Sequence, residues 1–212
     1  MILYDYCRSS AAYRVRIALN LKALAYQQVP VSLLAGEQAS AEHLARNPQG
    51  LVPALQDGDL MLTQSLAICE YLDEAYPESV PLMPDNAVGR ARVRALAQLV
   101  ACDIHPVNNL RMLKYLVAEF SASDEQKTRW YQHWVYRGFD ALEALLAGSD
   151  ATGHYCHGDQ PTLADLCLVP QVFNAQRFKC NLERYPTIAR INANCLAVPA
   201  FAAAHPDLQP GA

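Results

Sequence analysis

The sequence predicts an α/β domain over residues 1–80, a linker over 81–86 and an all-helical domain over 87–212. Three observations support this fold class. Strand and helix signals alternate over the first part of the chain, three prolines fall between Pro77 and Pro84, and beyond them strand signals fade while Ala- and Leu-rich stretches appear. Closely spaced prolines cannot continue a helix, so we place the domain boundary there.

The first half of the α/β domain indicates a strand, a helix and a second strand. Ile2 to Tyr6 is an apolar, β-prone run, Ala11 to Lys22 carries apolar residues at helical spacing, and Tyr26 to Val31 is again β-prone. An Ala-rich helical piece follows at Ala39 to Arg46. This order predicts a βαβ unit.

The second half indicates a hairpin and a closing helix. Leu51 to Gln56 and Leu60 to Thr63 flank an Asp57-Gly58-Asp59 turn, and a helix begins at Ser65 with apolar residues at helical spacing. A βαβ unit followed by ββα is the element order of a thioredoxin-like domain.

The remaining chain predicts helices over about 87–118, 125–147, 163–179 and 187–204. The start of the third is marked by Thr162 as N-cap and Asp165 as the carboxylate that bonds back to it. We interpret this pair as a structural device that fixes a core helix.

Composition indicates an ordinary soluble protein. The 212 residues are 52% hydrophobic and 18% charged, and the net charge of −4 gives no reason to expect a nucleic-acid partner. No apolar run is long enough for a membrane span, and the N-terminus lacks a secretory signal pattern. The 7 cysteines are scattered and never spaced as Cys-x-x-Cys, which is typical of reduced thiols in a cytoplasmic protein.

Arg8-Ser9-Ser10 places two hydroxyls and an arginine where a strand passes into a helix. Ser9 or Ser10 can cap that helix, while its first N–H groups and the positive end of its dipole favour an anion such as a thiolate. An ordinary N-cap is the structural alternative.

Two further features suit the ends of a peptide ligand. Pro53 begins a strand, where a cis bond would turn the N–H and C=O of Val52 outward to pair with an extended peptide, although a simple strand-edge proline is equally compatible. Ser65 begins a helix whose N-terminus can hold a carboxylate. A thiolate site, a peptide-pairing site and a carboxylate site together describe glutathione.

Over its whole length the chain resembles the zeta class of glutathione transferases, and within it the bacterial maleylacetoacetate isomerases. The matching segments, in order, are Arg8-Ser9-Ser10 with Tyr13 to Leu19, Asn47 to Pro53, Gln64 to Ile68, Asp103 to Pro106 with Asn108 to Leu110, Thr162 to Asp165, and Leu168 to Gln171 running to Arg177-Phe178. The resemblance implies the glutathione transferase architecture.

The resemblance also implies the residues of the site. Ser9 would face the glutathione sulfur, with Arg8 and Arg177 as the partners of the substrate carboxylates. The implied glutathione site comprises Ser9, Ser10, Ala11, Ala12, Tyr13, Arg14, Gln38, Val52, Pro53, Gln64, Ser65, His105, Asn109, Leu110 and Arg111. Gln38 lies in a loop without a motif to anchor its position.

The implied activity is the glutathione-dependent cis–trans isomerisation of 4-maleylacetoacetate to 4-fumarylacetoacetate in tyrosine and phenylalanine breakdown. Glutathione would be a cofactor regenerated in each turnover, the partner a small dicarboxylate enone, and the assembly a homodimer. Maleylpyruvate isomerisation in gentisate breakdown, a general transferase or peroxidase activity, and a non-catalytic glutathione-binding role are the alternatives.

Two departures from the family pattern affect the predicted site. Ala11 stands where a cysteine is often found, and Cys7 stands where an aromatic residue is usual. Cys7 creates a Cys-x-x-Ser pattern that single-thiol redox enzymes use, although a buried cysteine at a strand end is the simpler interpretation. His154-Tyr155-Cys156-His157 lies in a glycine-flanked loop with no evident fourth ligand, so we predict no metal site.

Overall fold

A four-stranded sheet organises the first of the two units into which the chain divides. The computed structural model describes residues 1–212. The first unit contains Met1–Met83 and Leu196–Ala212, and the second contains Pro84–Cys195. Residues 196–212 therefore pack with the α/β unit, which differs from the expected division at 81–86, in which they belonged to the helical domain.

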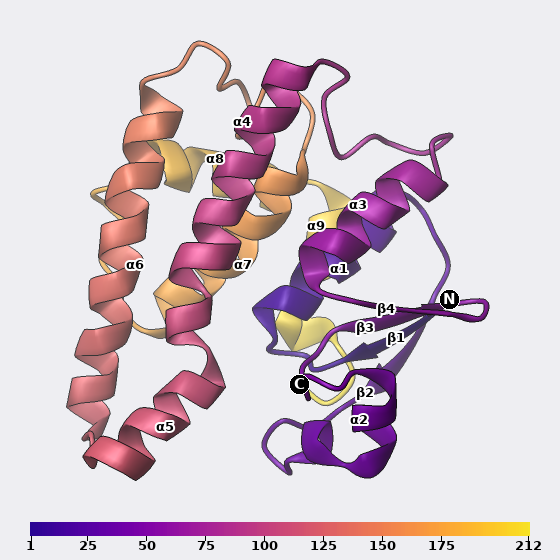
Figure 1. The fold of residues 1–212 in the computed structure, drawn as a ribbon. Helices are drawn as coiled ribbons and strands as arrows, with labels where there is room; N and C mark the ends of the chain where they lie inside the picture. Colours follow the sequence, from indigo (N-terminus) through magenta and orange to yellow (C-terminus); the bar gives the residue numbers. More distant parts are fainter. The chain divides into compact units, whose positions relative to one another are not determined.

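The strand order is β2-β1-β3-β4, with β1 parallel to β2 and the other pairs antiparallel. This topology confirms the predicted βαβ and ββα halves (Figure 1). The elements are β1 (Ile2–Asp5), α1 (Ser10–Leu21), β2 (Gln27–Pro30), η1 (Glu37–Ala39), α2 (Ala41–Arg46), β3 (Ala54–Asp57), β4 (Leu60–Thr63) and α3 (Ser65–Ala75).

Both faces of the sheet are covered, α1 and α3 lying on one face and α2 on the other (Figure 1). Tyr4 belongs to a buried cluster with Val52 and Ala54, and its ring lies under the Arg46 guanidinium of α2 at 4.3 Å. Leu3, fully buried, points to the opposite face because successive strand residues alternate. Burial on both sides fixes the register of β1.

The returning C-terminal segment forms α9 (Pro199–Ala203) and the 3₁₀ turn η4 (Pro206–Leu208). It packs against α1, where Asn20 Nδ2 donates to Ala200 O at 3.1 Å. The expected helix over 187–204 is interrupted before Pro199, which takes the first position of α9, where its missing N–H costs nothing.

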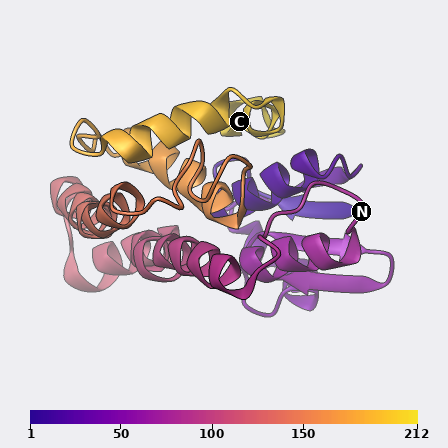
Figure 2. The same cartoon turned by 90° about the horizontal axis from the view of Figure 1, so that it is seen from above.

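The helical unit is built around α7, which is buried along nearly its whole length and lies between α4 and α8 (Figure 2). The stretch expected as one helix over 87–118 divides around Pro106, which has no N–H to continue an α-helical ladder. The elements are α4 (Ala87–Gln98), the π-helical turn η2 (Leu99–Ile104), η3 (Pro106–Asn108), α5 (Leu110–Phe120), α6 (Asp124–Ala147), α7 (Leu163–Arg177) and α8 (Pro186–Leu196). None of the helices has the length and apolar character that crossing a membrane requires.

The predicted start of α7 is confirmed. Asp165 is fully buried, and its Oδ2 accepts from Thr162 N at 2.8 Å and from Thr162 Oγ1 at 2.9 Å. Its Oδ1 accepts from Cys156 N at 2.8 Å, so the same carboxylate also holds the preceding loop. Burial raises the pKa of Asp165, an effect that these donated hydrogen bonds partly oppose.

Candidate active site

Ser9 caps α1, and its hydroxyl lies at the predicted anion site. Its backbone is extended (φ −75°, ψ 119°), and Oγ accepts from Ala12 N at 3.2 Å. A hydroxyl that accepts this bond keeps its own hydrogen for another acceptor. The first turn of α1 contains no acidic residue, so the Ser9 hydroxyl and the helix dipole both favour an anion here.

Arg8 lies directly before this cap and is exposed. No other side chain of the structure forms an ion pair with it. Beyond the cap, Ser10, Ala12 and Tyr13 are buried and Ala11 is half-buried. The cap therefore presents one hydroxyl and one available guanidinium, while the following residues anchor α1 in the core.

Arg14 joins the two helix starts that the sequence predicted as anion sites. Its Nη1 donates to Ser65 Oγ at 3.2 Å, and both side chains are buried. A guanidinium carries its charge at any pH in the physiological range. The start of α3 thus lies beside a fixed positive charge that comes from α1.

The N-terminus of α3 is capped by no side chain. Gln64 precedes it with φ 67° and ψ 111°, a conformation rare for a residue other than glycine. The Gln64 side chain instead donates to Gln49 Oε1 at 2.7 Å. The first N–H groups of α3 consequently remain available to an external carboxylate.

The backbone groups of Val52 are left unpaired within the chain, next to the cis bond that the sequence suggested. The Val52–Pro53 bond is cis, and neither the N–H nor the C=O of Val52 takes part in a hydrogen bond within the chain. The preceding carbonyl, Leu51 O, accepts from His43 Nε2 at 2.9 Å and from Asn47 Nδ2 at 2.8 Å.

His43 and Asn47 are positioning residues that the sequence did not predict. Both are buried and hold the segment immediately before Val52. Asn47 lies in a segment that carries the family resemblance, which is a signal that could have found it. His43 carries no such signal, because its role depends on a carbonyl eight residues away.

Gln38, the prediction without a sequence anchor, lies close to this segment. Its backbone oxygen would lie 3.2 Å from a Cβ built on Gly50, which has φ +63°. The Gln38 side-chain oxygen is buried and accepts no hydrogen bond from the protein. A buried acceptor without a donor suits a ligand that brings one.

The helical unit carries the other predicted residues. His105 ends the π-helical turn η2, and Asn109 caps α5 by accepting from Arg111 N at 3.1 Å. Arg177 ends α7 and is exposed, and its Nη1 donates to Asn174 Oδ1 at 3.3 Å. Arg177 forms no ion pair within the chain, so its charge is available to an anion.

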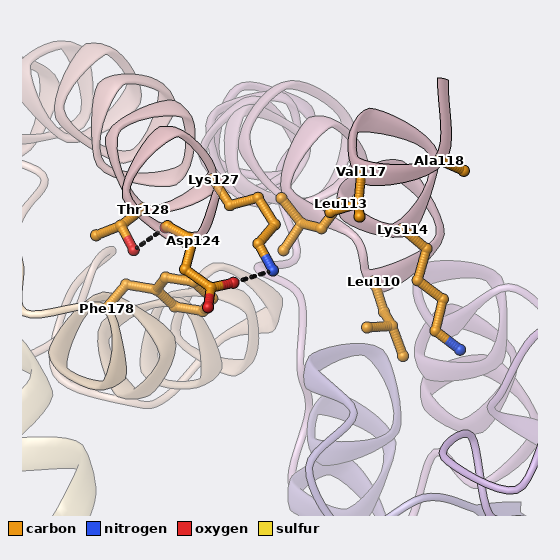
Figure 3. A pocket seen from close by; sticks show the side chains of 9 residues that line it. All are labelled: Leu110, Leu113, Lys114, Val117, Ala118, Asp124, Lys127, Thr128 and Phe178. Atoms are coloured by element: carbon orange, nitrogen blue, oxygen red, sulfur yellow. Dashed lines mark hydrogen bonds and ion pairs between the residues drawn. The ribbon is translucent and has the colours of Figure 1, made fainter. Parts of the chain in front are cut away.

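A pocket of about 580 Å³ lies beside two of these segments within the helical unit (Figure 3). Leu110 borders it next to Arg111, and Phe178 borders it next to Arg177. Its walls are mainly apolar, with two lysines, one of which pairs with Asp124 at 2.6 Å. Apolar walls with an ammonium group suit a small organic anion. The lining residues are Leu110, Leu113, Lys114, Val117, Ala118, Asp124, Lys127, Thr128 and Phe178.

Comparison with known proteins identifies the family. Residues 1–74 match the model of the glutathione S-transferase N-terminal domain, and residues 124–191 match a model of its C-terminal domain. A probable maleylacetoacetate isomerase of Vibrio cholerae is 53% identical over 100% of this chain and 98% of its own length. The chain belongs to the glutathione S-transferase family.

Other members of this family are similar over their full length. A maleylpyruvate isomerase of Ralstonia is 49% identical over 99% of both chains. Among solved structures, the holo structure of a maleylpyruvate isomerase, described as a bacterial zeta-class transferase, has a TM-score of 0.98 at 48% identity over 100% of both chains. A maleylacetoacetate isomerase of Methylobacterium extorquens AM1 with bound malonate and glutathione has a TM-score of 0.97 at 45% identity over 100% of this chain and 99% of that one. The resemblance and the fold class expected from the sequence are confirmed.

Proposed function

We propose that the protein is a glutathione-dependent cis–trans isomerase that converts 4-maleylacetoacetate to 4-fumarylacetoacetate. The observation that carries the proposal is Ser9, a helix cap whose hydroxyl hydrogen remains available, with the exposed Arg8 beside it. Full-length relatives named maleylacetoacetate isomerase support the choice of reaction.

The α/β unit fits glutathione in chemical terms. Glutathione is a thiol tripeptide with two carboxylates, and this unit offers the Ser9 hydroxyl, the backbone of Val52, the buried acceptor of Gln38 and the open N-terminus of α3. When bound, glutathione supplies a thiolate that adds to the cis double bond, permits rotation and leaves again. We assign His105, Asn109, Leu110 and Arg111 of the helical unit to the same ligand because of the family resemblance.

Ser9 has the task of favouring the thiolate form. A free thiol has a pKa near 8.5, so a shift of about two units requires roughly 2.7 kcal/mol of preferential thiolate stabilisation. A helix N-terminus contributes about 0.3–1 kcal/mol and a hydrogen bond to a charged group about 1.5–3 kcal/mol. The dipole of α1 alone is therefore insufficient, whereas the dipole and the Ser9 hydroxyl together suffice.

Arg8 and Arg177 are assigned to the substrate. Each is exposed and forms no ion pair within the chain, and a guanidinium binds a carboxylate through two parallel hydrogen bonds. Negative charge grows on the substrate oxygens as the double bond is attacked, so cationic donors lower the barrier.

A spectrophotometric assay tests the proposal. Purified protein with maleylacetoacetate should form fumarylacetoacetate only when glutathione is present, and glutathione should not be consumed. Absence of turnover, or equal turnover without glutathione, would refute the proposed function.

Maleylpyruvate isomerisation is the second candidate, because a solved maleylpyruvate isomerase matches this chain with a TM-score of 0.98. The two substrates share the reacting enone and differ in the separation of their carboxylates. The ratio of kcat/KM for the two substrates under identical conditions decides between them. A higher rate with an electrophilic aromatic halide or a peroxide would instead indicate a general transferase or peroxidase.

We also propose that the protein is a cytoplasmic homodimer. Family resemblance supports the dimer, and the seven free cysteines support a reducing compartment. Light scattering on a sizing column tests the first statement, since a mass near 23.4 kDa would indicate a monomer. Fractionation of the source cells tests the second.

A further inference from the structure

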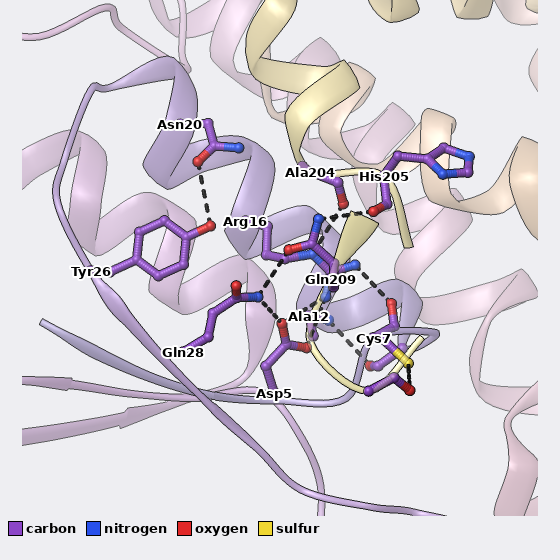
Figure 4. A network of polar contacts seen from close by, with 12 residues as sticks. Asp5, Cys7, Ala12, Arg16, Asn20, Tyr26, Gln28, Ala204, His205 and Gln209 are labelled. Atoms are coloured by element: carbon purple, nitrogen blue, oxygen red, sulfur yellow. Dashed lines mark hydrogen bonds and ion pairs between the residues drawn. The ribbon is translucent and has the colours of Figure 1, made fainter. Parts of the chain in front are cut away.

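The thiol of Cys7 has a defined partner at the far end of the sequence. Its Sγ donates to Gly211 O at 3.1 Å, and the side chain is only 3% exposed (Figure 4). Cys7 lies two residues before the Ser9 cap. The C-terminal tail is thus bonded to the turn that presents the Ser9 hydroxyl.

Arg16 bonds to the same turn from inside the core. This fully buried guanidinium donates to Asp5 Oδ1 and Oδ2 at 2.9 and 2.7 Å, to Cys7 O at 2.9 Å and to Ala204 O at 3.1 Å (Figure 4). Two of these acceptors, Asp5 and Cys7, lie in the strand and turn leading to Ser9, and the third lies in the returning C-terminal segment.

Gln209 completes the connection. Its Nε2 donates to Ala203 O and His205 O, both at 2.8 Å, which closes the tail into a compact turn. Its Oε1 accepts from Gln28 Nε2 at 3.0 Å, and the same nitrogen donates to Asp5 Oδ2 at 2.9 Å. The carboxylate of Asp5 is therefore held from two sides.

We propose that Arg16, Cys7 and the tail around Gly211 are positioning elements that hold the Ser9 hydroxyl at the thiol of glutathione. Ser9 N donates to Tyr6 O at 2.8 Å, so the turn from Asp5 to Ser9 is short and closed. Both the carbonyl and the thiol of Cys7 are bonded, one to Arg16 and one to the tail. Movement of Cys7 is transmitted directly to Ser9.

This inference rests on the proposed function and gives Cys7 a role that is neither nucleophilic nor redox. A hydrogen bond to a developing thiolate depends steeply on placement, since a misplacement of about 1 Å can change rates by about 100-fold. A turn fixed at both ends keeps the Ser9 hydroxyl in place without any contact between the tail and the ligand.

The test measures the pKa of bound glutathione from thiolate absorbance as a function of pH. Cys7→Ala removes the donor to Gly211 O and should raise this pKa by about half to one unit, with an about 1.5- to threefold loss of thiolate at pH 7. Cys7→Ser restores a donor and should return the pKa close to the wild-type value. Cys180→Ala, which removes a buried cysteine of the helical unit, is the matched control and should change nothing.

Two further variants address the other partners. A chain ending at Gln209 lacks Gly211 and should behave like Cys7→Ala. Arg16→Lys retains the charge but lacks the planar guanidinium that reaches Asp5, Cys7 and Ala204 together, so it should lower kcat more than it raises KM for glutathione. The inference would be overturned if all these variants fold and show the wild-type thiolate signal, with only their melting temperatures lowered. Absence of the signal in the wild type would instead refute the proposed function and the inference with it.

Discussion

At the scale of single residues, Ser9 caps α1 through Ala12 N and keeps its own hydroxyl hydrogen. In the proposed function that hydrogen is donated to the glutathione thiolate. A cap on its own stabilises a helix in any protein, and the chain contains such a cap at Ser123, which accepts from Gln126 N at 3.2 Å. Comparing substitutions at the two serines therefore distinguishes helix capping from thiolate stabilisation.

Ser9→Ala should raise the pKa of bound glutathione by about one to two units and lower kcat at least about tenfold, because the hydrogen bond to the charged sulfur is lost. Ser123→Ala removes a comparable cap and should lower stability by about 0.5–2 kcal/mol with an unchanged thiol pKa. Thiolate absorbance and urea unfolding measure the two effects. If bound glutathione has the same pKa in Ser9→Ala and Ser123→Ala, then Ser9 is only a helix cap.

Gly50 is the second residue whose identity the site requires. A Cβ there would lie 3.2 Å from Gln38 O, and the backbone has φ +63°. Gly50→Ala should destabilise the protein by about 1–2 kcal/mol and also weaken glutathione binding, because Gln38 must move. Gly36 also has a positive φ, +80°, but no atom lies within 4 Å of a Cβ built there, so Gly36→Ala should destabilise without changing affinity. Calorimetric titration with glutathione distinguishes the two variants.

At the scale of elements, the β3–β4 hairpin is tied to the end of α3 by one carboxylate. Asp57 Oδ2 accepts from Tyr71 Oη at 2.9 Å and from Tyr76 Oη at 2.6 Å. These bonds require neutral phenols, and the bond to Asp57 raises the pKa of Tyr76 to about 12. The connection between hairpin and helix is therefore lost when strongly alkaline pH ionises these phenols.

Because the pKa of Tyr76 is higher in the folded state than its ordinary value of 10.0, its contribution to stability is complete below pH 10. That contribution is lost as the pH rises from there toward the folded-state value. Urea unfolding should show a smaller alkaline loss of stability in Tyr76→Phe than in the wild type. Tyr115→Phe, on the exposed face of α5, is the control and should retain the wild-type pH dependence. If the unfolding free energy of Tyr76→Phe falls with alkaline pH as steeply as that of the wild type, this explanation is wrong.

The start of α7 is likewise held by a single carboxylate, that of Asp165. Asp165→Asn replaces an acceptor of three hydrogen bonds from Thr162 and Cys156 and should reduce stability by about 2–4 kcal/mol, since buried donors would lose their partner. Asp159→Asn changes an exposed carboxylate that accepts only from His154 N in the neighbouring loop and should have a much smaller effect. Thermal unfolding measures both, and equal losses would exclude the capping explanation.

At the scale of the whole molecule, the α/β unit is discontinuous in sequence. A chain ending at Val198 lacks α9 and the tail, so Arg16 loses Ala204 O and the covering segment. Hydrogen exchange should show reduced protection of β1 and α1, with α6 and α7 little changed. Uniform loss across both units would show instead that the segment supports the entire molecule.

Local sequence patterns were sufficient to predict much of the fold. The βαβ and ββα order, the helix cap at Ser9 and the box of Thr162 with Asp165 each depend on residues close in sequence, and the structure confirms them. The return of residues 196–212 to the first unit could not be predicted, because an Ala-rich stretch has the same helical pattern whichever unit it packs on.

The partners of buried polar groups were equally inaccessible from sequence. Arg16 lay unremarked within the Tyr13 to Leu19 segment of the family resemblance, yet its partners include Asp5 and a carbonyl of the C-terminal segment. The His43 bond to Leu51 O likewise follows from a close approach of backbone that no spacing reveals. The parts of the candidate site that depend on such contacts were predicted only where the family resemblance supplied them.

The position of Ala204 has a consequence for synthesis of the chain. Arg16 leaves the ribosome 188 residues before the carbonyl to which its Nε is bonded. In a nascent N-terminal segment the Arg16 guanidinium, which the folded core encloses, is therefore exposed. The core around it cannot close before residue 204 has been made. Synthesis normally lets the N-terminal domain fold first. Here the N-terminal segment cannot complete its core so early, so chaperones should engage it until residue 204 has been made.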